Sequence, residues 1–198
     1  MNRRLTARGR ERRRQLMDYA ARRFAENGYH PTSVAEIVAG MEVGKGVFYW
    51  YFDSKETLLI EILAEAQRDL RRSQMAAIAA EADPLRRIEV GIRRTLEWMA
   101  DNRHLFSLFE FAASDERFAP SLRRGQEVAV GDVVRHVKQA MVGAGANAEA
   151  DPLVVSYAIL GVTNALARTF LFERGDPPQT VADAAISFCL GGILGKAA

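Results

Sequence analysis

Residues 43–59 read VGKGVFYWYFDSKETLL, and their pattern predicts a short aromatic helix followed directly by another helix. A helix over residues 45–51 turns by about 100° per residue, so it has two distinct sides. One side is apolar and consists of Val47, Phe48 and Tyr51. A helix this short needs burial of one side in order to form, so we expect Phe48, Tyr51 and the following Phe52 to pack in a core.

The opposite side of this helix offers a cation, a gap and an aromatic hydroxyl, from Lys45, Gly46 and Tyr49, with Trp50 on the flank. Lysine binds phosphate or guanine, glycine allows a close approach, and tyrosine contacts a thymine methyl group or a phosphate. This side therefore fits a DNA groove. For Trp50, contact with DNA and packing in the core remain two open interpretations.

Helices are expected before this stretch as well. In residues 8–27 large apolar side chains recur on one helical face, and Gly28 ends the helix. Ser33 and Glu36 have the spacing of a capping box, which marks the start of a second helix. The order is therefore a long helix, a short helix, a turn and the aromatic helix.

Another helix begins directly after the aromatic run. Asp53 and Glu56 repeat the capping spacing, and Lys55 lies in the first turn. A helix N-terminus with a lysine beside it is a phosphate site. We therefore expect Lys55 to hold a phosphate.

Together these segments resemble the TetR family of helix-turn-helix transcriptional regulators. The resemblance rests on residues 32–39, TSVAEIVA, and on residues 43–59, which follow the family pattern G-V-S-K-G-T-L-Y-H/W-Y-F-x-S/N-K-E-x-L. It covers roughly residues 8–65. Three positions depart from the pattern: the turn glycine is Glu42, the N-cap serine is Gly44, and the threonine within the helix is Val47.

The resemblance implies a set of DNA-binding residues. Thr32 and Ser33 would bond phosphates, Lys45 and Gly46 would face bases, and Tyr49 and Trp50 would contact backbone and base methyl groups. Val47 would meet a thymine methyl group if it reaches the DNA. The full set is Thr32, Ser33, Lys45, Gly46, Val47, Tyr49, Trp50 and Lys55.

The rest of the chain also indicates helices. No run shows the apolar alternation of a strand, and Asp83-Pro84 and Asp151-Pro152 each give an N-cap carboxylate followed by a proline at the first helical position. We predict an all-α fold of about nine helices. Residues 1–55 would form the DNA-binding domain, with a basic arm at residues 1–8, and residues 56–198 would sense a ligand and dimerise.

Large apolar residues are concentrated in residues 96–118. Packing in a helical core is the simple interpretation, and lining of an apolar ligand cavity is the more specific one. The lining set that we expect is Trp98, Met99, Phe106, Phe109, Tyr157 and Phe170. Polar groups that could orient a ligand are His104, His136 and Asn164.

The last two helices are apolar on more than one face, which indicates a partner. The resemblance implies a four-helix bundle formed with a second copy, and burial within one subunit is the alternative. The interface residues expected are Gly161, Ala165, Ala185, Phe188 and Gly192. Residues 152–167 lack formal charge but fall short of the roughly 20 apolar residues of a membrane span, so we expect a buried helix and no membrane.

Basic charge is concentrated at the N-terminus. The whole chain has a net charge of +2, whereas residues 1–23 contain nine arginines against Glu11 and Asp18 and so carry +7. A basic end favours a polyanionic partner, and the alternative is a solvated tail. Cys189 is the single cysteine and no signal peptide is recognisable, which predicts a reducing, cytoplasmic setting.

These observations predict a homodimeric regulator that binds a palindromic double-stranded DNA operator and is released by a small apolar or amphipathic ligand. The resemblance implies that it is a repressor, since repression is the common mode of the family, and the sequence itself leaves activation open. No catalytic or metal-binding motif such as H-E-x-x-H, C-x-x-C or G-x-S-x-G occurs. We therefore expect no enzyme activity, no cofactor and no metal. The alternatives are an architectural DNA binder without a ligand and an enzyme that acts on a small apolar substrate.

Overall fold

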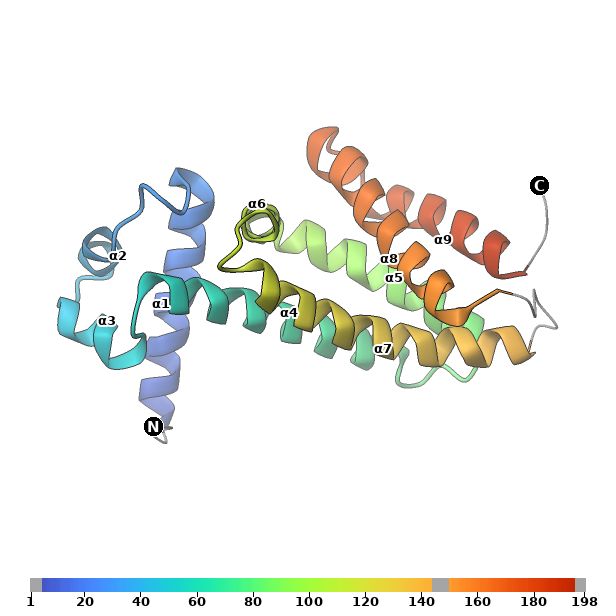
Figure 1. Cartoon of the computed structure of the whole chain (residues 1–198), viewed down its shortest axis with the longest axis horizontal. Coiled ribbons are helices and arrows are strands. Elements are labelled where there is room, and N and C mark those ends of the chain that lie inside the picture. The colour runs from blue at the N-terminus through green and yellow to red at the C-terminus, as the bar shows by residue number, and fades with distance from the viewer. Residues whose placement is uncertain (1–4, 144–149, 195–198) are drawn as a thin grey trace. The chain divides into compact units, whose positions relative to one another are not determined.

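The computed structural model describes residues 5–143 and 150–194, and these residues form nine α-helices and no strand (Figure 1). The predicted all-α fold is therefore confirmed, and the aromatic helix has the bounds that its sequence predicts. The helices are α1 (Ala7–Asn27), α2 (Val34–Gly40), α3 (Lys45–Tyr51), α4 (Lys55–Ile78), α5 (Pro84–Asp101), α6 (Arg103–Ser114), α7 (Ala119–Gly143), α8 (Pro152–Leu166) and α9 (Pro178–Leu194), and a π-helical segment, Ala167–Glu173, continues α8.

The chain divides into two compact units. The first unit combines Met1–Gln67 with His104–Leu122, and the second combines Arg68–Arg103 with Arg123–Ala198. Helix α6 and the start of α7 therefore belong to the same compact unit as the N-terminal helices. The predicted boundary at residue 55, between DNA binding and ligand sensing, stays a prediction.

The ends of the first helices follow from local chemistry. The Ser33 hydroxyl accepts a hydrogen bond of 3.1 Å from the backbone N–H of Glu36, as its capping spacing predicts. Gly28 ends α1 with φ of 86°, a left-handed conformation that glycine adopts without strain. The start of α4 differs from expectation, because the cap is Ser54, which accepts from the Thr57 N–H at 3.0 Å, and not Asp53.

The turn between α2 and α3 carries strain at Glu42. This residue has φ of 52°, the left-handed conformation that the glycine of the family pattern would adopt freely. The glycine of this segment is instead needed at position 40, since a Cβ on Gly40 would lie 1.8 Å from the Tyr19 hydroxyl oxygen. Gly40 therefore allows the close approach of Tyr19, and Glu42 adopts the left-handed conformation of the turn.

Replacing Glu42 by glycine is expected to raise the free energy of unfolding by about 1 kcal/mol. The change removes left-handed strain of about 1–2 kcal/mol, and greater freedom of the unfolded chain offsets part of that gain. Urea unfolding at one fixed protein concentration measures the change. Glu42→Ala is the matched control, because it keeps the Cβ and should give no comparable gain in stability. If both variants were stabilised equally, the gain would not come from relief of left-handed strain at Glu42.

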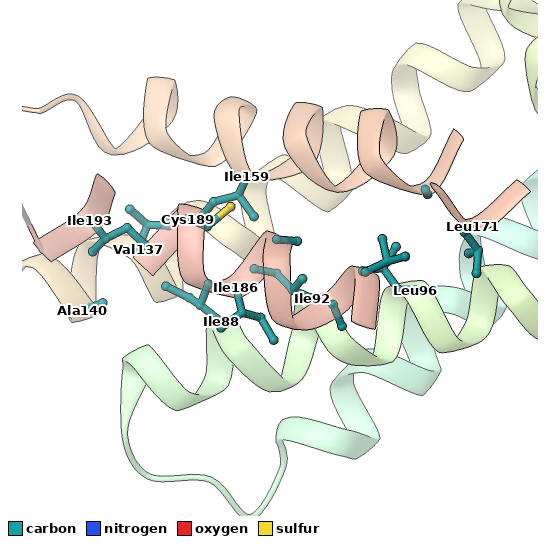
Figure 2. Close-up of a cluster of buried hydrophobic side chains, with 14 residues drawn as sticks. Ile88, Ile92, Leu96, Val137, Ala140, Ile159, Leu171, Ile186, Cys189 and Ile193 are labelled. Atoms are coloured by element: carbon teal, nitrogen blue, oxygen red, sulfur yellow. The ribbon is translucent and has the colours of Figure 1, made fainter. Parts of the chain in front are cut away.

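The core of the second unit lies between α5 and α9, with α7, α8 and the π-helical segment around them (Figure 2). Figure 2 shows Ile88, Ile92 and Leu96 of α5 pointing into the same layer as Ile186 and Ile193 of α9. All five side chains are buried. The expected caps of α5 and α8 are confirmed, since Asp83 accepts from Leu85 N–H and Asp151 from Leu153 N–H.

Helix α8 is not the buried helix that its lack of charge predicts. Together with the π-helical segment it forms a helix, Pro152–Glu173, that is long and apolar enough to cross a membrane, and only 22% of its most apolar window is buried within the chain. Inward-facing Ile159 and Thr163 are buried, whereas Val154 is 64% exposed. The sequence shows that the segment is apolar, but not whether its own chain or something else covers it.

Candidate functional site

The outer side of α3 is exposed, as its sequence predicts. Lys45 and Gly46 are exposed, and a Cβ built on Gly46 would meet no atom within 4 Å. Tyr49 is 56% exposed and Trp50 is 49% exposed, so the structure places both rings at the surface. Val47 is half-buried, at the edge of this face.

Buried aromatic rings hold α3 in place. Phe48 is fully buried, and its ring centroid lies 5.7 Å from that of the buried Phe52. Tyr51 is half-buried beside them. A helix of seven residues has little stability of its own, so this packing fixes the direction in which Lys45 and Tyr49 point.

The two residues at the start of α2 have different roles. Ser33 is exposed, so its hydroxyl can donate to a phosphate while it accepts the capping bond from Glu36. Thr32 is fully buried, and its hydroxyl donates to the carbonyl oxygen of Gly28 at 2.8 Å. This hydroxyl therefore closes the turn between α1 and α2 and is not exposed to a phosphate, and the phosphate contact of Thr32 stays a prediction.

Lys55 also differs from its predicted role. Its Nζ donates to the backbone carbonyl oxygens of Tyr29 (2.9 Å), Thr32 (2.9 Å) and His30 (3.3 Å), and it lies 4.3 Å from the centroid of the Tyr29 ring. Burial lowers the pKa of the ammonium group. An ammonium group has three donors, so none is left for a phosphate, and Lys55 instead ties α4 to the turn between α1 and α2.

Two arginines that the motif reasoning missed lie beside the exposed end of α3. Arg8 and Arg12 line a groove together with Trp50 and Tyr51. Neither arginine forms an ion pair with any described residue, whereas others on α1 do, such as Arg23 with Glu36 at 2.7 Å. Positions 8 and 12 are one helical turn apart, but Arg10 and Arg14 have the same spacing, so the sequence alone does not single out Arg8 and Arg12. The groove adds positive charge to the side of the unit where Trp50 is exposed.

The second unit contains a cavity of about 90 Å³. Helices α4, α5, α7 and α8 each contribute to its walls, and eight of the 17 lining residues carry polar or charged side chains. Its lining residues are Arg71, Gln74, Met75, Ile78, Arg87, Ile88, Gly91, Ile92, Thr95, Ala129, Asp132, Val133, His136, Ile159, Leu160, Thr163 and Asn164.

None of the six aromatic and methionine residues expected to bind a ligand lines this cavity. Trp98 is buried and donates from Nε1 to Asp69 at 2.8 Å, Met99 and Phe170 pack against the core of the second unit, and Tyr157 is 46% exposed. Phe106 and Phe109 belong to α6 in the first unit. Of the polar candidates, His136 and Asn164 line the cavity and His104 does not.

An apolar face of α8 and α9 is exposed. Gly161 and Ala165 lie on it, and Phe188 is 68% exposed. Ala185 is fully buried in the core of its own chain, so its predicted place at an interface is wrong. The surroundings of Gly192 lie outside the described residues.

Comparison with known proteins supports the N-terminal site. Residues 16–62 match the family described as bacterial regulatory proteins, tetR family. The chain is 43% identical over 53 residues to the HTH-type transcriptional regulator YuxN of Bacillus subtilis, and this match covers 27% of the chain and 18% of that protein. It is 36% identical over 78 residues to the HTH-type transcriptional repressor DhaR of Mycobacterium sp. (strain GP1), with 39% of each chain covered. The chain thus aligns with less than half of the length of these two relatives.

Solved structures resemble the whole fold. The fatty acid degradation regulator FadR of Bacillus halodurans superposes with a TM-score of 0.83 at 16% identity, covering 91% of this chain and 95% of that one. The ketosteroid transcriptional regulator KstR2 of Mycobacterium tuberculosis gives a TM-score of 0.71 at 24% identity, covering 92% and 95%. These likenesses show the fold. The matched N-terminal region, residues 16–62, belongs to the TetR family of bacterial regulatory proteins, and the exposed face of α3 lies within it.

Proposed function

We propose that this regulator is a homodimeric, cytoplasmic repressor that reads a palindromic operator and leaves it when a small molecule binds the cavity of the second unit. The observation that carries the proposal is the exposed side of α3. Lys45, Gly46 and Tyr49 form an open face there, while the buried Phe48 holds the helix from behind. No step of this function requires catalysis or a cofactor.

Reading and positioning fall to different residues in this proposal. Lys45 and Gly46 face base edges in the DNA groove, and Val47 lies at the margin of that groove. The lysine can donate to a base, and the glycine has no side chain that would keep the helix away from the DNA. Tyr49 and Trp50 contact backbone and thymine methyl groups. The phosphate contacts come from Ser33 and, near the start of α1, from Arg8 and Arg12, and such contacts position the protein without reading sequence.

Dimerisation follows from the exposed apolar face of α8 and α9. On α8, Gly161 lies two turns after Val154 and one turn before Ala165, and all three are exposed; on α9, Phe188 is exposed as well. Exposed apolar surface that exceeds single scattered residues marks an interaction site. A two-fold dimer through this face would present two copies of α3, so the operator would have two related half-sites about one helical turn apart or a multiple of that.

For a ligand to control DNA binding, the DNA-free and DNA-bound forms of the protein must differ in their affinity for that ligand. A ligand releases the operator only if it binds the DNA-free arrangement more tightly than the DNA-bound one, and couplings of about 1–3 kcal/mol are typical. The cavity among α4, α5, α7 and α8 supports this part of the proposal. An architectural DNA binder would leave that cavity without a role.

Lys45→Ala tests the reading face. We expect a loss of about 1–3 kcal/mol in binding at one base position per half-site, and a relaxed preference at that position. Binding to an operator, to operators mutated one position at a time and to random DNA measures both effects. Lys138→Ala, which removes an exposed lysine of α7, is the control and should change neither. Equal weakening on every sequence would make Lys45 a phosphate contact and contradict its reading role.

A further inference from the structure

We propose that the cavity of the second unit binds a short aliphatic carboxylate, whose carboxylate group contacts Arg87 and His136 and whose hydrocarbon chain packs against isoleucine side chains. This inference rests on the proposed function, because it names the ligand class of the sensor. It concerns only residues within the second unit, and it leaves the DNA-binding face unchanged.

The walls of the cavity fit a short hydrocarbon chain. Ile88 and Ile92 of α5 face the cavity together with Ile159 of α8, and Ile78 and Val133 close its sides. The volume of about 90 Å³ compares with roughly 10–15 Å³ for one water site and with about 150 Å³ for an apolar cavity that binds benzene. The cavity therefore suits a narrow aliphatic chain better than a ring system.

Arg87 supplies positive charge that no described carboxylate neutralises. Its Nε donates to the backbone carbonyl oxygen of Glu81 at 2.6 Å, and Nη1 donates to Oε1 of Gln139 at 3.4 Å. Both partners are neutral acceptors. Because a guanidinium group has five N–H donors, three remain without a partner among the described residues, and a carboxylate is the group that a guanidinium binds best.

The other charges of the lining cancel. Asp132 accepts from Nε of Arg71 at 2.5 Å and from Nη2 at 3.2 Å, and Arg135 lies 3.8 Å from the same carboxylate. A cationic ligand would have to displace Arg71 from Asp132 and approach Arg87. The lining therefore favours an anion.

His136 provides a second contact for the anion. Its Nδ1 is buried and has no hydrogen-bond partner. Burial lowers the pKa of the imidazole, and the charges of Arg87 and Arg135 lower it further, which favours the neutral ring. In the tautomer with the proton on Nδ1, this atom is a donor without an acceptor, which a carboxylate oxygen would supply.

Calorimetric titration of the full-length protein tests the ligand class. The probes are butanoate, hexanoate and octanoate, with hexanol, hexanamide and hexyltrimethylammonium as matched six-carbon compounds of other charge. We expect hexanoate to bind at least about tenfold more tightly than hexanol, because the charged contact to Arg87 adds to the same apolar burial. Stronger binding of hexyltrimethylammonium, equal binding of hexanol and hexanoate, or no binding by any probe would overturn the proposal.

Two variants locate the site. Arg87→Gln should weaken hexanoate binding at least about tenfold and leave hexanol binding unchanged, and His136→Phe should do the same in smaller measure. Arg86→Gln is the matched control, since Arg86 pairs with Glu89 and does not line the cavity; it should change neither affinity. Unaltered hexanoate binding in both cavity variants would overturn the site. Operator binding without ligand is measured separately, so failure here is distinguishable from failure of the proposed function.

Discussion

Replacing Lys55 by methionine is expected to destabilise the first unit by about 2–3 kcal/mol and to leave the salt dependence of DNA binding unchanged. The ammonium group donates to three backbone carbonyl oxygens of the turn between α1 and α2, and hydrogen bonds to a charged group contribute about 1.5–3 kcal/mol each before solvent exposure reduces their value. Methionine keeps the length of the side chain and removes the donors. Urea unfolding at fixed protein concentration measures the destabilisation.

Lys45→Met is the matched control for this prediction. Lys45 is exposed and forms no hydrogen bond or ion pair with a described residue, so its replacement should change stability by less than about 0.5 kcal/mol. It should instead impair operator recognition. If Lys55→Met retained full stability and flattened the salt slope by about 0.9 for each phosphate that the variant no longer binds, Lys55 would bind DNA and not the turn.

Phe188→Arg is expected to convert the dimer into a folded monomer. Phe188 is 68% exposed in the isolated chain, so an arginine is tolerated there until a second copy covers it. In the dimer each arginine would be an uncompensated buried charge, which costs roughly 3–5 kcal/mol. Analytical ultracentrifugation at micromolar concentration measures the change, and circular dichroism confirms that the helices remain.

Val128→Arg controls for the added charge, because Val128 is 50% exposed and belongs to α7, which is not one of the two proposed interface helices. This variant should sediment as the wild type does. Ala185→Arg is unsuitable for the test, since Ala185 is fully buried in the core of its own chain and its replacement would impair folding. A wild type that is monomeric at micromolar concentration, or a dimeric Phe188→Arg variant, would contradict the proposed interface.

The sequence predicts those features that depend on local periodicity. The two sides of α3 follow from a fixed rotation per residue, and the caps at Ser33, Asp83 and Asp151 follow from short-range hydrogen bonding. Each of these features involves residues within about one helical turn, so whether it forms depends little on how distant helices pack.

Features that depend on distant packing were not predictable in this way. The carbonyl oxygens that Lys55 binds lie 23 to 26 positions earlier in the chain, so spacing within α4 could not reveal them. Ala185 has the small side chain of an interface residue and of a core residue alike, and only the position of α5 decides between them. The cavity likewise forms from four helices, and its lining by isoleucines and not by Trp98 or Tyr157 depends on how those helices rotate.

Selection of bound fragments from random double-stranded DNA, with the wild-type protein and no added ligand, tests whether the protein reads a palindromic operator as a dimer. The exposed face of α3 and the proposed two-fold dimer predict an enriched near-palindrome whose half-site centres lie about 10–10.5 base pairs apart, or a multiple of that. Lys45→Ala should relax one position in each half-site of that sequence. Recovery of no preferred sequence would contradict base reading by α3, and recovery of one unpaired half-site would contradict binding as a two-fold dimer.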